Sequence, residues 1–329
     1  MSRTAAWKLL LAGLEHTDPL VRCDAARLLG GLGDRRAVPA LIALLARDRH
    51  LTKITAVYAL DAIKDPRAVP ALRRLAADPG VFRFPGMHYH DMIRLAAAVA
   101  LARQGDDSGV QAVNDLLRLQ LLPAMLELGP AILAAPRTAA MRRLRAYVNL
   151  PFVQHFHGGR ASASNRFFAV RCLAFLREPA ARYLLSEDLA HFSRYVRPAA
   201  AAALLAHGPA SLSAVARQAK RERTAFGRLR FSAVLHAHGS DATAAVARGL
   251  RDRDPFIRAT ALDTAVELQL RSLAAPATAL LADADAYVRG RAAAAVPVLA
   301  ARQAGALLAP LLADADPRTA LEAAAALLA

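Results

Sequence analysis

The sequence predicts an all-α protein, a right-handed α-α superhelix with an irregular central segment. Residues 18–47, DPLVRCDAARLLGGLGDRRAVPALIALLAR, hold two stretches in which apolar residues recur every three or four positions, as in helices buried on one face. Altered copies of this unit follow along much of the chain. Runs of β-branched residues alternating with polar ones, which would predict strands, do not occur in the sequence. Because neither helix of the unit can cover its apolar face alone, neighbouring units are expected to stack.

The first helix is expected over residues 2–16, and the unit at 18–47 supplies the next two. Asp18 is expected to cap the second helix and Pro19 to be its first residue. Gly30, Gly31 and Gly33 are expected to end that helix, and proline at position 39 suits the first turn of the third. The side chains expected to face inward are Trp7, Leu10, Leu11, Leu14, Val21, Ala25, Leu28, Leu29, Leu32, Leu41, Leu44 and Leu45.

The sequence AVPAL recurs 31 residues apart, at 37–41 and 68–72, and Asp254, Asp285 and Asp316 repeat the same interval. The next match is displaced, which places an insertion near 79–90, and prolines with a Gly/Ser stretch interrupt the pattern over 119–168. We therefore expect one domain over 1–329. It comprises regular repeats over 1–118 with the insertion, an irregular Arg-rich centre over 119–168, and regular repeats over 169–329.

The sequence of the unit matches a known repeat pattern. Twelve positions agree with the pattern D-x-x-V-R-x-x-A-x-x-A-L-G-x-L-G-D-x-x-A-V-x-x-L, namely Asp18, Val21, Arg22, Ala25, Leu29, Gly30, Leu32, Gly33, Asp34, Ala37, Val38 and Leu41. The chain thus resembles HEAT-repeat proteins of the bacterial type, named for the bilin lyases of phycobilisomes, over residues 1–115 and 190–329. The resemblance implies the solenoid fold and a habit of binding proteins or nucleic acid along a concave surface, and it names no substrate.

Charge indicates an anionic partner. The formal net charge is +16, with 39 arginines against four lysines, and residues 128–177 contain no Asp or Glu at all. A solvated face would normally mix both signs. This segment is therefore expected to meet an anionic surface. Its arginines are Arg137, Arg142, Arg143, Arg145, Arg160, Arg166, Arg171 and Arg177.

A second set of arginines repeats with the helices. Arginines at this position commonly pair with an aspartate of the turn in the same or the next unit, and Asp18–Arg22, Asp254–Arg258 and Asp285–Arg289 are predicted to do so. Arg94, Arg171, Arg197 and Arg230 lack an acid four residues earlier, although Asp91 and Glu187 could substitute. The residues predicted to bind a ligand are Arg94, Arg137, Arg142, Arg143, Arg145, Arg160, Arg166, Arg171, Arg197 and Arg230.

Histidines offer a weaker hypothesis. His88 and His90, like His155 and His157, form His-x-His pairs in the irregular segments, and such pairs can place two imidazoles on one transition metal. No other cofactor is predicted, because the nucleophile-elbow, dinucleotide and P-loop motifs are missing from the sequence. The two cysteines, Cys23 and Cys172, are expected to be unpaired, and no apolar leader or spanning stretch is evident, so we expect a cytoplasmic protein.

The resulting hypothesis is a non-catalytic scaffold or adaptor whose basic concave surface recognises an acidic protein segment or a phosphate-bearing polymer. HEAT-repeat deoxyhypusine hydroxylases carry His-Glu dipeptides, which this chain lacks. A nucleic-acid-binding protein or HEAT-like DNA glycosylase is the alternative, weakened because the sole Trp is Trp7 and the Arg-rich centre holds no Asp. An assembly factor resembling the bilin lyases is the second alternative. The last stretch, TALEAAAALLA, lacks a polar cap and predicts either fraying or a homodimer through the C-terminal helix.

Overall fold

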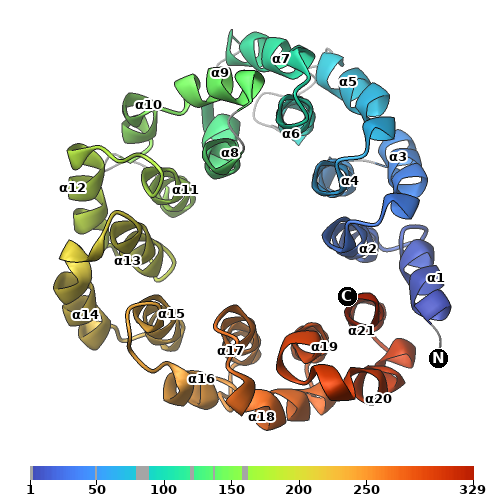
Figure 1. Cartoon of the computed structure of the whole chain (residues 1–329), viewed down its shortest axis with the longest axis vertical. Helices are drawn as coiled ribbons and strands as arrows, with labels where there is room; N and C mark the ends of the chain where they lie inside the picture. The colour runs from blue at the N-terminus through green and yellow to red at the C-terminus, as the bar shows by residue number, and fades with distance from the viewer. Residues whose placement is uncertain (1–2, 49, 79–88, 119–121, 136–137, 158–161) are drawn as a thin grey trace. The chain divides into compact units, whose positions relative to one another are not determined.

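The computed structural model describes residues 3–48, 50–78, 89–118, 122–135, 138–157 and 162–329. Within these ranges every regular element is a helix, so the all-α prediction is confirmed. The chain divides into two compact units: unit 1 comprises Met1–Ala40 with Ala219–Ala329, and unit 2 comprises Leu41–Gln218. Helices α3 (Val38–Arg47) and α14 (Leu212–Arg221) cross the two divisions. Figure 1 labels the helices along the chain.

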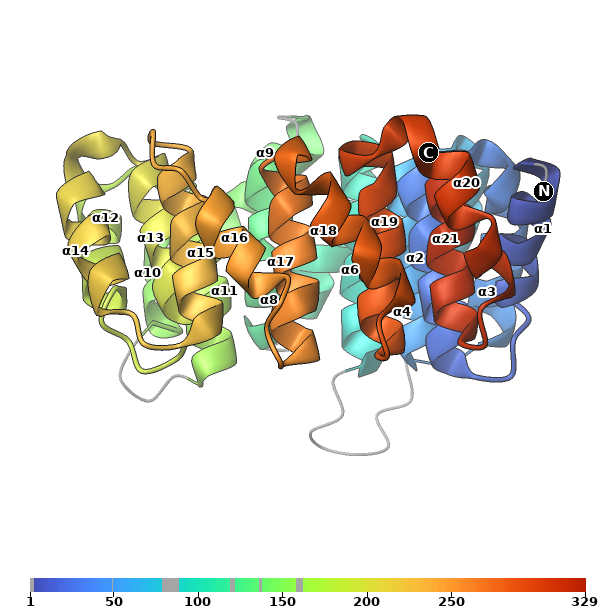
Figure 2. The same ribbon diagram turned by 90° about the horizontal axis from the view of Figure 1, so that it is seen from below.

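Unit 1 is built from two layers of helices, which we call A and B (Figure 1). Its B helices pack side by side in the order α2, α21, α19, α17, α15, and each A helix packs on the B helix that follows it in sequence. Figure 2 shows α17, α19 and α21 as neighbours. The A helices are α1 (Arg3–Gly13), α16 (Thr243–Gly249), α18 (Ala274–Ala279) and α20 (Ala304–Leu308). The B helices are α2 (Pro19–Leu32), α15 (Ala225–His236), α17 (Pro255–Glu267), α19 (Ala286–Leu299) and α21 (Pro317–Leu328).

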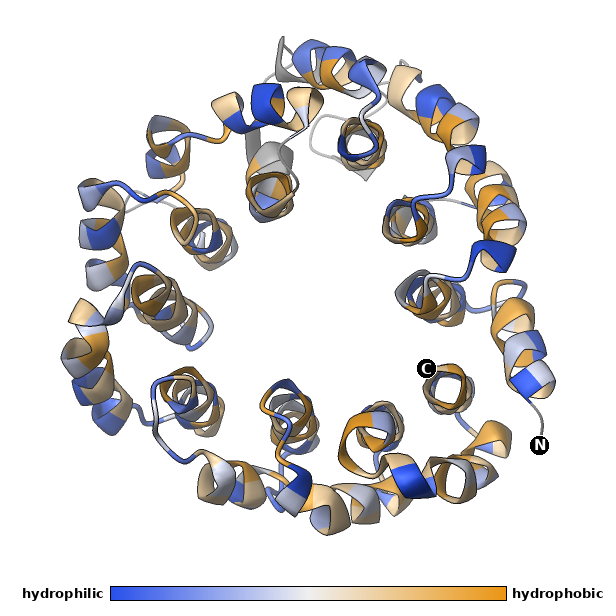
Figure 3. Ribbon diagram, viewed as in Figure 1, coloured by the Kyte–Doolittle hydropathy of each residue, from blue (hydrophilic) through white to orange (hydrophobic). Residues whose placement is uncertain are grey.

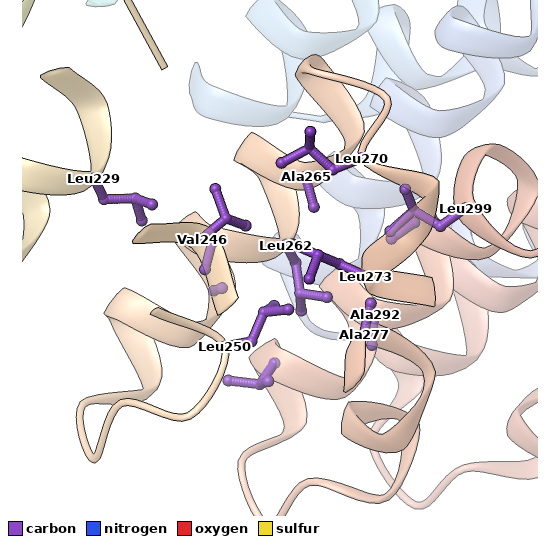
Figure 4. Close-up of a cluster of buried hydrophobic side chains, with 14 of the residues drawn as sticks. Leu229, Val246, Leu250, Leu262, Ala265, Leu270, Leu273, Ala277, Ala292 and Leu299 are labelled. Atoms are coloured by element: carbon purple, nitrogen blue, oxygen red, sulfur yellow. The ribbon is translucent and has the colours of Figure 1, made fainter. Parts of the chain in front are cut away.

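The core of unit 1 lies between its two layers. Leu262 on α17 is fully buried among side chains of the neighbouring helices, including Leu250, Leu273 and Ala292 (Figure 4). Burying a leucine side chain contributes about 1.5–3 kcal/mol relative to exposure. Short 3-10 turns join the layers here and in unit 2: η1 (Arg35–Ala37), η2 (Pro66–Ala68), η3 (Pro209–Ser211), η4 (Arg271–Leu273), η5 (Leu280–Ala282), η6 (Ala301–Gln303) and η7 (Pro310–Ala313).

Unit 2 repeats the two-layer plan with one irregularity. Its B helices α4, α6, α8, α11 and α13 pack in chain order. Two short A helices, α9 and α10, precede α11, and this is the form that the irregular centre takes. Of its prolines, Pro130 lies inside α8, whereas Pro151 begins α10. The helices are α4 (His50–Ile63), α5 (Val69–Ala77), α6 (Tyr89–Arg103), α7 (Asp107–Arg118), α8 (Leu122–Ala134), α9 (Ala139–Tyr147), α10 (Leu150–His155), α11 (Ala163–Leu173), α12 (Pro179–Asp188) and α13 (Val196–Ala206).

Aspartates cap the B helices α2, α17, α19 and α21 of unit 1, and the prediction made for Asp18 is confirmed. The Asp18 side chain accepts the N–H of Leu20 at 2.8 Å, and Pro19 occupies the first turn, where its missing N–H costs nothing. Asp254 and Asp316 cap α17 and α21 in the same way, each followed by a proline. Helix α2 runs through Gly30 and Gly31 and ends at Leu32, where Gly33 adopts the left-handed conformation (φ 67°) that favours glycine.

The repeated arginine links successive repeats. Arg289 Nη1 donates to two carbonyls of the preceding turn, Asp283 O at 3.0 Å and Ala284 O at 3.3 Å. Its Nε and Nη2 donate to the two carboxylate oxygens of Asp314, 25 residues further on, at 2.9 and 2.8 Å.

Arg258 repeats this arrangement with Asp283, at 2.8 and 2.7 Å. Asp254 and Asp285 cap their helices, so the predicted pairs Asp254–Arg258 and Asp285–Arg289 are wrong. The acid comes from the turn of the next repeat, which is the other arrangement expected for these arginines. Arg22, predicted to pair with Asp18, donates to His16 O and Thr17 O.

Helix α21 is covered from within the chain. It packs against α1 and α2 inside unit 1, next to the C-terminal and N-terminal labels of Figure 1. Leu321 and Ala323 to Ala326 are buried, so the prediction that the array ends without a cap is wrong. The first helical pair supplies the cap that the sequence of α21 itself lacks.

Candidate partner-binding site

The Arg-rich centre contains a buried ionic cluster. Asp188, at the end of α12, is fully buried; its Oδ1 accepts from Arg166 Nε at 2.6 Å, and its Oδ2 lies 2.7 Å from His157 Nε2. Arg166 also donates to the carbonyl of His157. A buried carboxylate needs paired charge and full hydrogen bonding, and this cluster provides both. Arg166, predicted to bind a ligand, is thus held by an acid that lies outside the acid-free stretch.

The loop between α12 and α13 is held by the same cluster and by Arg197. Arg197 Nη1 donates to His191 O and Phe192 O, both at 2.9 Å, as the repeated arginines of unit 1 do in their turns. Burial lowers the pKa of His191; Asp188 acts in the opposite direction, and Arg166 and Arg197 lower it further. Arg166, Arg197 and His157 therefore lie together at this turn of unit 2.

An aromatic pocket opens beside this loop. Its cavity of ≈550 Å³ lies between the first turns of α11 and the segment that leads into α13. Phe192 leaves 81% of its surface exposed, and its ring lies 4.3 Å from the ring of His191. Exposed apolar patches of this kind mark binding surfaces. The lining residues are Ala163, Ser164, Phe167, Phe168, Phe192, Ser193, Arg194 and Tyr195.

Two guanidinium groups lie over aromatic rings that line the pocket. Arg171 lies over Phe167, 5.7 Å from the ring centre, and Arg194 lies over Tyr195 at 5.0 Å. Arg194 Nη2 also donates to the Tyr195 hydroxyl at 2.9 Å. Stacking on an aromatic face restricts where a guanidinium can lie and so places positive charge beside the pocket.

Helix α9 carries three predicted arginines, and its ribbon is hydrophilic in the middle, between more apolar ends (Figure 3). Arg145 donates to Leu133 O at 2.8 Å, to Ile132 O at 3.3 Å and to Ala135 O, and so satisfies carbonyls at the end of α8. Arg143 is exposed, with its Nη1 3.6 Å from Asp107 Oδ1. Arg142 is exposed as well.

The remaining predicted arginines lie elsewhere. Arg94 on α6 is only 8% exposed, and its Nε has no hydrogen-bond partner. Arg230 lies on α15 in unit 1 and pairs with Glu267 at 2.8 Å, so another acid takes the place of the one missing four residues earlier. Arg137 and Arg160 fall outside the described residues. Their role in ligand binding stays a prediction.

The metal hypothesis gains no support from the part of the chain that the structure describes, where no group of three or more His, Cys, Asp or Glu residues could hold an ion. His157 is committed to Asp188, and His155 is exposed with its ring 5.0 Å from that of Phe156. His88 and the side chain of His90 lie outside the described residues. Their convergence with His155 stays a prediction.

Neither Cys23 nor Cys172 forms a disulfide, as predicted. Burial raises the pKa of Cys172 to about 12, which keeps this thiol protonated and unreactive. Its surroundings are tight, because a Cβ on Gly129 would come within 2.6 Å of the Cys172 Sγ. Cys172 is therefore a packing residue of α11.

Sequence reasoning missed the residues that form the pocket. Phe168, Phe192, Arg194 and Tyr195 were not predicted, and Asp188 was not recognised as the partner of Arg166. One signal could have found the pocket: in a chain with only 5% aromatic residues, Phe-Phe at 167–168 and His-Phe-Ser-Arg-Tyr at 191–195 are local concentrations. Asp188 carried no such signal, because a single acid beyond the acid-free stretch does not reveal which arginine it meets.

The stacked A and B helices and their repeated capping define a class of protein, the HEAT-repeat solenoid. Residues 8–83 match the family of HEAT repeats, in agreement with the resemblance that the sequence pattern predicted. A search of curated protein sequences gives no match.

Solved structures similar to this chain include human deoxyhypusine hydroxylase in complex with glycerol, with 18% identity, 82% of this chain and 97% of that chain covered, and a TM-score of 0.37. The complex of CpcE and CpcF of phycocyanin lyase from Nostoc sp. PCC7120 is 18% identical, with 100% of this chain and 95% of that chain covered and a TM-score of 0.29.

A helix that crosses a bilayer must be long and apolar. Across the described ranges, no single helix is long and apolar enough to cross a membrane. The segments Ala286–Leu299 and Ala301–Ala313 pass together on length and composition, but they are bent by 112° relative to each other.

Proposed function

We propose that this protein is a non-catalytic binding scaffold that recognises an acidic protein segment at the aromatic pocket of unit 2. A HEAT-repeat solenoid suits a scaffold or assembly factor. The observation that carries the proposal is the ≈550 Å³ cavity with Phe192 81% exposed beside it and stacked arginines at its aromatics.

The chemistry of the pocket favours an apolar anchor next to acidic residues. An aromatic or branched aliphatic side chain seated against Phe167, Phe168 and Phe192 would remove apolar surface from water, at about 25 cal/mol per Å². Carboxylates beside that anchor would meet Arg171 and Arg194, whose stacked geometry reduces the entropy lost on binding. The net charge of +16 would speed the approach of such a segment.

Fluorescence anisotropy with short labelled peptides tests the proposal. A peptide rich in Asp and Glu with one central Trp should bind, the same peptide with Ala for Trp should bind more weakly, and one with Lys for the acids should not bind. Phe192→Ala should weaken the first peptide about tenfold or more, as expected for a central aromatic contact. Tyr183→Ala is the matched control, because Tyr183 is 65% exposed and does not line the pocket.

A duplex DNA of random sequence is the second probe, because aromatics with arginines also suit stacked bases and phosphates. Binding of DNA with a steep inverse dependence on salt, together with no peptide binding, would replace the proposal by the nucleic-acid alternative. Equal loss in Phe192→Ala and Tyr183→Ala would contradict the pocket as the site.

A further inference from the structure

The interface between α21 and the first helical pair differs from the other interfaces of unit 1. Repeats of a solenoid normally contact their neighbours in sequence. Here Arg27 Nη2 on α2 lies 2.5 Å from Glu322 Oε1 on α21, a separation of 295 residues along the chain. Arg318 pairs with Asp24, and Arg3 Nη2 donates to Leu328 O at 2.6 Å. We call this interface the terminal joint.

The apolar part of the terminal joint is complementary and closely packed. A Cβ on Gly13 of α1 would come within 2.9 Å of both Leu321 Cδ2 and Ala25 Cβ. An uncovered α21 would expose a continuous apolar face, which favours a partner. The buried residues of α21 are Thr319, Ala320, Leu321, Glu322, Ala323, Ala324, Ala325 and Ala326.

The polar side of the joint is open. A cavity of ≈460 Å³ lies between α2, α17, α19 and α21, and charged side chains line much of it. The side chains of Arg27 and Arg318 are 48% and 44% exposed, whereas those of their partners Glu322 and Asp24 are 11% and 16% exposed, so solvent and salt screen these ion pairs only in part. The joint therefore combines apolar side chains that must be covered with specific ion pairs whose arginines reach solvent.

We propose that the terminal joint is an exchangeable interface whose second partner is another copy of this chain. Every copy carries both faces, and α21 of one copy makes the same contacts on α1 and α2 of another as it makes on its own. The joint can form within one chain, giving a monomer, or between two copies, giving a dimer. The balance depends on the effective concentration of the two ends within one chain relative to the protein concentration, as in domain swapping. This gives the homodimer predicted from the C-terminal sequence a defined surface.

Charge reversal at the two faces of the terminal joint distinguishes a joint made within one chain from a joint made between two copies. Variant N, Asp24→Arg with Arg27→Glu, sets like charges against Arg318 and Glu322 of its own chain. Variant C, Arg318→Asp with Glu322→Arg, sets like charges against Asp24 and Arg27 of its own chain. A mixture of the two restores both opposite-charge pairs only between different copies. The mixture should therefore form a one-to-one dimer in sedimentation velocity at concentrations at which each variant alone is a monomer.

The chain carrying all four substitutions is the control, because its own pairs are restored in reversed sense, and it should remain monomeric like the unsubstituted protein. Gly13→Val added to both variants should abolish the dimer, since the valine side chain clashes with Leu321 in either form. A mixture of folded variants N and C that stays monomeric would overturn the proposal.

A second measurement uses the unsubstituted chain and does not depend on the variants folding. Unfolding in urea and refolding at high protein concentration should trap dimers that refolding at low concentration does not produce. Monomer alone under both conditions would also overturn the proposal.

Discussion

Arg145 and Arg166 come from the same acid-free stretch of sequence and have different environments. Arg145 donates to carbonyls at the end of α8, where the helix dipole favours a cation. Arg166 reaches Asp188, which is fully buried. Arg171 instead stays exposed over Phe167. Arginines that the protein itself satisfies serve stability, whereas Arg171 is exposed beside an aromatic ring, where a guanidinium can meet a carboxylate.

The Asp188 cluster supports a stability prediction. Arg166→Met removes the guanidinium that pairs with a buried carboxylate, and breaking a buried pair in this way costs about 3–5 kcal/mol. We expect this decrease in the free energy of unfolding from urea denaturation. Arg142→Met, at an exposed position of α9, is the control and should change it by less than about 0.5 kcal/mol.

Adding Asp188→Leu to Arg166→Met removes the buried charge as well as its partner. This double variant should recover part of the lost stability, because replacing a buried pair by apolar side chains is often neutral. A single variant as stable as the unsubstituted protein would show that Asp188 is adequately satisfied without Arg166.

At the scale of the helix pair, stability depends on links between successive repeats. The hydrogen bonds from Arg289 hold the pKa of Asp314 below its usual 3.8, against the opposing effect of burial. The carboxylate therefore stabilises the fold at any pH above the unfolded pKa of about 3.9, and this contribution is lost as the pH falls through the lower folded value.

Asp314→Asn tests this link. The variant should be less stable than the unsubstituted protein at pH 7, and its stability should fall less steeply between about pH 4 and pH 2, because the titrating group is gone. Urea midpoints across this range measure the effect. Asp107→Asn, at a side chain 67% exposed, should leave the profile nearly unchanged. Parallel profiles for Asp314→Asn and the unsubstituted protein would contradict the assignment.

Local features of the helices were predictable because they depend on few residues. Asp18, Pro19 and Gly33 cap α2 as expected, since each acts within one helical turn. The partner of Arg289 was not, because Asp314 lies 25 residues away and is reached only once two repeats stack. The aromatic pocket was not predicted for a related reason. Its lining residues come from α11 and from the loop beyond α12, and the sequence pattern does not show that these segments lie together.

The whole chain carries a formal charge of +16, and a general field of this size attracts any polyanion. Attraction by the net charge acts over a longer range than recognition at a pocket. At about 0.15 M salt the screening length is about 8 Å, whereas at about 0.01 M it is about 30 Å. At physiological salt, only charges close to the ligand should therefore contribute to its affinity.

Three double reversals with the same change in net charge distinguish the two explanations. Arg171→Glu with Arg194→Glu acts at the pocket aromatics, and Arg142→Glu with Arg143→Glu acts on exposed α9. Arg271→Glu with Arg302→Glu acts at exposed turns of unit 1. The probe is the Trp-containing acidic peptide, with its anisotropy measured at both salt concentrations.

At about 0.15 M salt the pocket pair should lose about tenfold or more in affinity, the α9 pair less, and the unit 1 pair about twofold at most, because screening removes distant charges. At about 0.01 M all three should weaken binding more nearly alike, since the field then extends over tens of ångströms. Equal losses at both salt concentrations would mean that the net charge of the protein alone attracts the peptide and that the aromatic pocket is not its site.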